Sequence, residues 1–166
     1  MFELEKTDEV RRLIQITKSD SGVSGPELVK AHIRLGEILG RCIELNPLDT
    51  TIVAMMRGGI FFAQGMYMTL GCRFQTYNPK NETFVRPATK NILLVDSVIN
   101  TGKTIREIMN PDMKIACCII NENAVEYFTE QLYTVRVSGN SYVGSEVKKQ
   151  SGTVGPDTTM RLFNQI

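Results

Sequence analysis

The chain has 166 residues, of which 42% are apolar and 22% charged, and its formal net charge is +1. Such a composition suits a globular protein with its own apolar core and excludes the strong basic field of a dedicated nucleic-acid binder. No apolar stretch approaches the roughly 20 residues of a membrane-spanning helix, and the acidic, amphiphilic start MFELEKTDEV differs from a secretory signal. We therefore expect a cytoplasmic protein with small-molecule partners and neither a nucleic-acid nor a membrane partner.

The four cysteines give no sign of a metal site or a disulfide framework. Cys42, Cys72, Cys117 and Cys118 form no CxxC pair and have no neighbouring histidine. Cys117 and Cys118 lie within the apolar run MKIACCII, where free thiols pack as small hydrophobic groups. We expect all four to be reduced.

The first predicted helix follows a polar N-terminal extension, residues 1–25, which ends in the loop-like SDSGVSG. Ser24 is a candidate N-cap, Pro26 falls in the first turn, and Glu27 completes a capping-box spacing. Apolar residues then recur at intervals of three and four, which predicts an amphipathic helix to about Glu44.

From the stop signal NPLD onward, short apolar runs alternate with helical stretches. Strands are predicted over 51–56, 72–77, 91–96, 114–120 and 132–138, helices over 60–71, 101–109 and 122–131, and a polar loop over 76–90. Continuous apolar strands separated by helices indicate a parallel sheet covered on both faces. We predict one α/β domain over residues 1–166.

The segment ILLVDSVINTGKT, residues 92–104, has the features of a phosphate-binding loop. A buried strand brings Asp96 to the sheet edge, where ligands bind in doubly wound folds. Gly102 permits close approach of the backbone to a ligand, free amides at a helix start suit a phosphate, and Thr101 and Thr104 add hydroxyl donors. Asp96 is placed to accept hydrogen bonds from ribose hydroxyls.

Two other interpretations of this segment remain open. The letters GKT also end a Walker A loop, but that motif needs a glycine five residues before Gly102, where Ser97 stands. The segment is also compatible with an ordinary strand-to-helix turn that binds nothing.

The same residues resemble the phosphoribosyl pyrophosphate (PRPP) motif of the type I phosphoribosyltransferases, a hydrophobic strand and acid followed by V-x-x-T-G-x-T. Most members have two adjacent acids, whereas this chain has Asp96 and Ser97, and the uracil phosphoribosyltransferases likewise keep only the first acid. The resemblance implies a mostly parallel central sheet flanked by helices, with Asp96 at the ribose. The PRPP contacts that it implies in this loop are Asp96, Ser97, Asn100, Thr101, Gly102, Lys103 and Thr104.

A second segment, TIVAMMRGGIFFAQGM (51–66), resembles the strand, arginine turn and helix of the uracil enzymes, where R-A-G is usual. Arg57 supplies planar, permanently charged donors for pyrophosphate oxygens. Gly58 and Gly59 expose backbone amides to the same anion. The alternative is a plain turn whose arginine makes a surface ion pair.

The C-terminal segment SGTVGPDTTMRLFNQI (151–166) resembles the base-binding ending P-G-x-G-D-x-G-D-R-x-F-G of the same family. Asp157, Arg161 and Phe163 match it, whereas Pro156, Met160 and Asn164 depart from it. The resemblance implies base binding mainly through the backbone of Thr153, Val154, Gly155, Pro156 and Asp157. An unstructured polar tail is the alternative.

Taken over residues 26–166, the resemblance implies transfer of a phosphoribosyl group from PRPP to uracil, giving UMP and pyrophosphate in pyrimidine salvage. It implies Asp96, Arg57 and Asp157 as catalytic residues, Mg²⁺ held mainly by substrate oxygens with no protein metal site, and a homodimer. Two alternatives stay open: transfer to another base, and a regulatory protein that binds PRPP in the same fold without turnover.

Smaller candidates carry weaker signals. Lys80 and Arg86 lie in the polar loop, which in the family covers the active site, so they contact pyrophosphate after closure or are simply solvated. His32, the only histidine, is expected to be packed or exposed within its helix rather than catalytic. Met55, Met56, Met66 and Met68 are expected to fill the core.

Overall fold

The sheet is built from six short strands, each parallel to its neighbours. The computed structural model describes residues 1–140 and 143–166. The strands are β1 (Phe2–Glu3), β2 (Thr50–Met55), β3 (Arg73–Tyr77), β4 (Asn91–Ile99), β5 (Lys114–Asn121) and β6 (Leu132–Ser138), in the order β1-β6-β5-β4-β2-β3. Every residue of β2 is buried, as expected for a strand covered on both faces. The predicted α/β fold with a parallel central sheet is confirmed.

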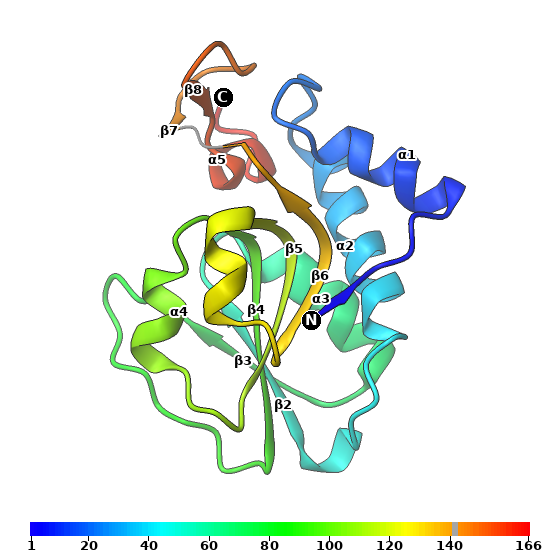
Figure 1. Ribbon diagram of the computed structural model, residues 1–166, viewed down its shortest axis with the longest axis vertical. Helices are drawn as coiled ribbons and strands as arrows, with labels where there is room; N and C mark the ends of the chain where they lie inside the picture. The colour runs from blue at the N-terminus through cyan, green and yellow to red at the C-terminus, as the bar shows by residue number, and fades with distance from the viewer. Residues whose placement is uncertain (141–142) are drawn as a thin grey trace.

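Helices cover both faces of the sheet (Figure 1). On one face lie α1 (Asp8–Thr17), α2 (Pro26–Gly40) and α3 (Ile60–Leu70), and on the other lie α4 (Lys103–Ile108) and the 3-10 helix η2 (Glu122–Tyr127). The short 3-10 helix η1 (Pro47–Asp49) leads into β2. Each face has its own apolar cluster, so the sheet forms the middle layer of three.

The C-terminal residues form a small unit beyond the carboxyl ends of the central strands, at the top of Figure 1. Strands β7 (Val143–Ser145) and β8 (Val154–Pro156) pair in parallel, and α5 (Thr158–Leu162) follows directly. The tail is therefore folded onto the domain, and the alternative of an unstructured tail is wrong.

Several predicted boundaries differ from the structure. The residue that caps α2 is Gly25, with φ of 64°, whereas the Ser24 hydroxyl donates to the Asn164 side chain at 3.3 Å; the helix ends at Gly40 rather than near Glu44. The expected helix over 122–131 is only a 3-10 turn that ends at Tyr127. Helix α1 lies inside the segment described as a polar extension, and β1 adds that segment to the sheet.

The four cysteines are free, and three of them are buried. Among the described residues, no helix is long and apolar enough to cross a membrane.

Candidate active site

Five segments that are distant in sequence line one cavity of about 670 Å³ at the carboxyl edge of the sheet. Because all central strands are parallel, the loops that follow β2 and β4 meet at this edge, and the tail closes over them. The lining residues come from the β2 turn (Met55, Met56, Arg57, Gly58), from β4 and its loop (Asp96, Ser97, Val98, Asn100, Thr104), from residues 78–80 and Gly144, and from residues 156–160.

Asp96 lies where β4 extends past its neighbour. Pairing of β4 with β2 ends at Val95, whereas pairing with β5 continues to Ile99, so the strand is three residues longer than predicted. Burial raises the pKa of the Asp96 carboxyl to about 7, against the opposing effect of the backbone amides of Ser97 and Val98. One carboxyl oxygen accepts the Ser97 amide at 2.7 Å. A carboxyl that titrates near neutrality, facing a cavity, is characteristic of functional sites.

The loop after β4 places small polar groups beside Asp96. The Ser97 hydroxyl oxygen is buried, lines the cavity and has no hydrogen-bond partner among the described residues. Asn100 and Thr104 line the same cavity, while Thr101 lines a neighbouring cavity of about 530 Å³. Gly102 precedes α4 with φ of 66°, and Lys103 is the exposed first residue of that helix. A left-handed residue such as Gly102 is a common element of backbone concavities that bind anions.

The turn after β2 fits tightly against β4. A Cβ atom on Gly59 would come within 2.6 Å of the Val95 carbonyl oxygen and 2.8 Å of the Met55 carbonyl oxygen, so only glycine fits there. Gly58 faces the tail, where a Cβ would lie 2.9 Å from the Thr159 hydroxyl. Close packing therefore accounts for both glycines without any anion bound to their amides.

Arg57 is exposed at the cavity and is held by the tail. Its guanidinium donates to the Gln165 side-chain oxygen at 3.2 Å and lies 5.0 Å from the centre of the Phe163 ring. Among the described residues it forms no ion pair, so the alternative of a surface ion pair is not what the structure has. An arginine without an acidic partner beside a cavity is available to bind an anion.

The tail is fixed at two points. The Asp157 carboxylate caps α5 by accepting the Met160 amide at 2.8 Å, and the Asp157 amide donates to the Ser145 carbonyl at 3.0 Å. Arg161 is 1% exposed, and its guanidinium donates to the carbonyls of Ile16, Thr17 and Val23 and to the Ser21 hydroxyl. The matched arginine thus ties the tail to the N-terminal segment and does not face the cavity.

The predicted base-binding residues divide between two cavities. Pro156 and Asp157 line the large cavity, Thr153 lines the neighbouring one, and Val154 and Gly155 belong to β8 without lining either. Thr158, Thr159 and Met160 line the large cavity and were missed, although a capping aspartate followed by two threonines is a recognisable helix start.

Comparison with known proteins relates the fold of this chain to solved structures. The sequence matches no protein-family model and no curated protein. Among solved structures, AQ2163 from Aquifex aeolicus matches with a TM-score of 0.64 at 14% identity, over 82% of this chain and 86% of that chain. TT1426 from Thermus thermophilus matches with a TM-score of 0.51 at 12% identity, over 80% and 96%. Orotate phosphoribosyltransferase from Aeropyrum pernix matches with a TM-score of 0.50 at 16% identity, over 63% and 70%.

The chain has the type I phosphoribosyltransferase fold. These likenesses concern the fold, and the choice of uracil stays a prediction.

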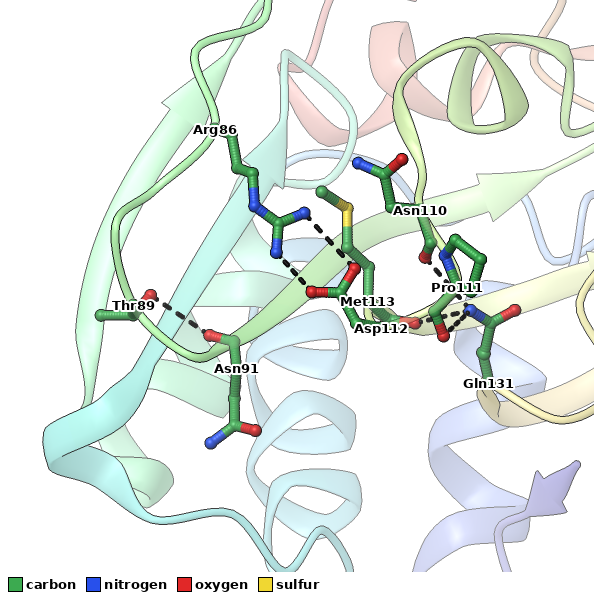
Figure 2. Close-up of polar contacts among 8 residues, drawn as sticks. All are labelled: Arg86, Thr89, Asn91, Asn110, Pro111, Asp112, Met113 and Gln131. Carbon is green, nitrogen blue, oxygen red and sulfur yellow. Dashed lines mark hydrogen bonds and ion pairs between the residues drawn. The ribbon is translucent and has the colours of Figure 1, made fainter.

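Within this phosphoribosyltransferase fold, the loop between β3 and β4 contributes one of its two basic candidates to the cavity. Lys80 lines it together with Asn78 and Pro79. Figure 2 shows that Arg86 instead pairs with Asp112, in the loop between α4 and β5. Arg86 is therefore bound to a surface carboxylate and does not line the cavity.

The remaining candidates from the sequence are His32 and the methionines. His32 is fully buried in α2, and its Nδ1 lies 2.9 Å from the Leu28 carbonyl oxygen. Burial lowers its pKa to about 4. His32 is therefore packed within the protein and is not exposed. Met55 and Met66 are in the core as predicted, but Met56 lines the cavity and Met68 is 60% exposed.

Proposed function

We propose that this protein transfers the phosphoribosyl group of PRPP to a nitrogen of a nucleobase and releases pyrophosphate. The observation that carries the proposal is that Asp96, the pair Asn100 and Thr104, and Arg57 line one cavity. These groups suit ribose hydroxyls, a 5′-phosphate and a pyrophosphate respectively. The phosphoribosyltransferase fold supports this assignment.

The reaction breaks the bond between ribose C1 and a pyrophosphate oxygen while a base nitrogen forms a bond to C1. Positive charge develops on the ribose and negative charge on the leaving pyrophosphate, so fixed charges and donors supply most of the catalysis. Arg57 stabilises the leaving group after exchanging its Gln165 contact for pyrophosphate oxygens. Asp96 accepts hydrogen bonds from the ribose hydroxyls and holds C1 in place.

Mg²⁺ would be held mainly by PRPP oxygens. The described residues include no group of three or more metal-binding side chains, and of the two carboxylates in the cavity Asp157 already caps α5. Asp96, the proposed partner of the ribose hydroxyls, is a single carboxylate and fits an ion held mainly by substrate oxygens. When bound, the ion supplies charge neutralisation on the pyrophosphate.

Uracil is the proposed acceptor, on the likeness of residues 151–166 to the uracil enzymes. Pro156 has no amide donor, so the remaining backbone groups and the hydroxyls of Thr158 and Thr159 would read the base edge. Asp157 acts as a positioning residue that fixes the start of α5 and with it these groups.

Pyrophosphate release tests the proposal. Purified protein is mixed with PRPP, Mg²⁺ and, separately, uracil, orotate, hypoxanthine and adenine, and we expect the fastest release with uracil. A purine preferred over uracil would reject the acceptor assignment alone. Calorimetric binding of PRPP without turnover on any base would favour the regulatory alternative, and absence of PRPP binding would overturn the proposed function.

A further inference from the structure

A second polar cavity, of about 430 Å³, lies between the end of α1 and the C-terminal unit. We name it the Arg136 cavity; its lining includes Lys18, Ser19, Asp20, Arg136, Asn140 and Gln150. Its volume is within the range of cavities that hold small metabolites, and every one of these lining side chains is polar. Nothing in the proposed transfer reaction uses it.

Arg136 is the unusual member of this lining. It projects from β6, is half-buried, and its Nε is enclosed without a hydrogen-bond partner among the described residues. No ion pair or other hydrogen bond of its guanidinium is found among those residues either. Arg161, by contrast, satisfies its guanidinium with backbone carbonyls. A buried charged donor without a partner is costly, so an arginine of this kind is suited to a bound anion.

The charged side chains on the enclosed side of the cavity are both positive. Lys18 and Arg136 are both partly buried, whereas Asp20, the acidic lining residue, is exposed and pairs with neither. The positive charge of Arg136 also acts on the interior. Burial is the main cause of the lowered pKa of His32, and the charges of Arg161 and Arg136 lower that pKa further. Two cations that pair with no carboxylate in the described part of the chain favour an anionic ligand.

A small pocket lies between this cavity and the candidate active site and shares lining residues with both. A pocket of about 30 Å³ shares Arg136 with the Arg136 cavity and shares Val98 and Thr158 with the large cavity. That volume holds about one water molecule, far too little for a nucleobase. We therefore expect a ligand in the Arg136 cavity to be separate from one in the active site.

We propose that the Arg136 cavity binds the phosphate or carboxylate group of a small-molecule ligand other than the transfer substrates. The Arg136 guanidinium holds two oxygens of the anion in its planar fork, and the Lys18 ammonium adds a second charge. This inference does not depend on the proposed transferase activity, because none of its residues belongs to the transfer machinery.

The test follows the Nε–H resonance of Arg136 by nuclear magnetic resonance during titration with inorganic phosphate and, separately, acetate. The resonance is assigned by its disappearance in Arg136→Gln. We expect a saturable shift with at least one of the two anions, weakened at least threefold in Lys18→Gln, and unchanged in Arg86→Gln, which removes the same charge from a distant surface pair. A resonance that does not shift, or shifts without saturating, would overturn the proposal.

Calorimetry with the same anions supplies a second measurement. The Thr101→Ala/Thr104→Ala background is used so that phosphate bound at the transfer loop does not contribute. Arg136→Gln should weaken the remaining binding at least tenfold and Arg136→Lys less, because lysine keeps the charge and loses the fork. Thermal unfolding verifies that each variant is folded.

Competition identifies the source of the anion. Phosphate or acetate should still shift the Arg136 resonance when PRPP with Mg²⁺ is saturating and, in a separate sample, when uracil alone is saturating. If uracil or orotate displaced the anion, the group would belong to the acceptor and the separate site would be refuted. If PRPP fails to bind while the Arg136-dependent shift persists, the transferase proposal fails and this one stands.

Discussion

Replacing Asp96 by asparagine should make the protein more stable and less active. Asparagine keeps the oxygen that accepts the Ser97 amide, so the local hydrogen bond survives. It removes a carboxyl whose pKa burial raises from 3.8 to about 7. The ionised form is disfavoured in the folded protein because it is largely withdrawn from water.

The sign and size of the stability change follow from proton linkage. Between pH 4 and 7 the folded protein retains a proton on Asp96 that the unfolded chain has released, so this group reduces stability as pH rises and does so fully above about pH 7. The difference between 3.8 and about 7, at about 1.4 kcal/mol per pH unit, gives about 4 kcal/mol as an upper bound. Since the carboxyl opens onto the cavity, we expect about 1 to 3 kcal/mol at pH 8.

Urea unfolding of wild type and Asp96→Asn at pH 4.5 and pH 8 measures this effect. The variant's advantage should be small at the lower pH and grow at the higher one, while pyrophosphate release falls at least tenfold. Asp112→Asn is the control with the opposite sign, because the pairing with Arg86 lowers the pKa of Asp112 and its loss reduces stability at neutral pH. An Asp96→Asn protein no more stable than wild type at pH 8 would refute the reasoning.

Three further variants test the packing and the roles around the cavity. Gly59→Ala should cost about 1 to 3 kcal/mol of unfolding free energy, because its Cβ would lie 2.6 Å from a backbone oxygen; an unchanged urea midpoint would contradict the tight turn. Arg161→Met should cost about 2 to 4 kcal/mol by leaving backbone carbonyls without their charged donor, which chemical denaturation would show. Arg57→Ala should raise the apparent Michaelis constant for PRPP at least tenfold more than that for uracil. The reverse result would place Arg57 at the base rather than at the pyrophosphate.

The central strands could be predicted because their buried runs are continuous and bounded by polar turns. In β2 and β5 almost every residue is enclosed, so the apolar run alone marks the strand. β4 is longer than predicted because Val98 and Ile99 still pair with β5 after the acid. The position of Asp96 beside its loop nevertheless followed from the pattern.

The helices were harder to predict because tertiary contacts decide their ends. In α1, charged residues surround a narrow apolar stripe of Val10, Leu13 and Ile14, so the segment looked like a polar extension. The segment after β5 has a helix-favouring composition, yet it stops at Tyr127. There Phe128 is buried and packs so close to Gly102 that a Cβ on that glycine would meet its ring at 2.6 Å.

The segments that meet at the cavity could be predicted from the sequence, but which of their residues face it could not. Arg57 and Arg161 are both arginines matched to one family, and only contacts in three dimensions separate an exposed group at the cavity from a buried anchor. Arg136 had no motif, because an unpaired charge is visible only when its surroundings are known.

The C-terminal tail links Arg161 to Arg57. Arg161 fixes α5 to the N-terminal segment, and the residues that follow α5 bring Phe163 and Gln165 against Arg57. The Gln165 contact is an exposed hydrogen bond worth about 1 kcal/mol, whereas pyrophosphate offers charged oxygens to the same guanidinium. In the proposed reaction, Arg57 would exchange this weak contact for the anion, and loosening the tail should weaken pyrophosphate binding as well as base binding.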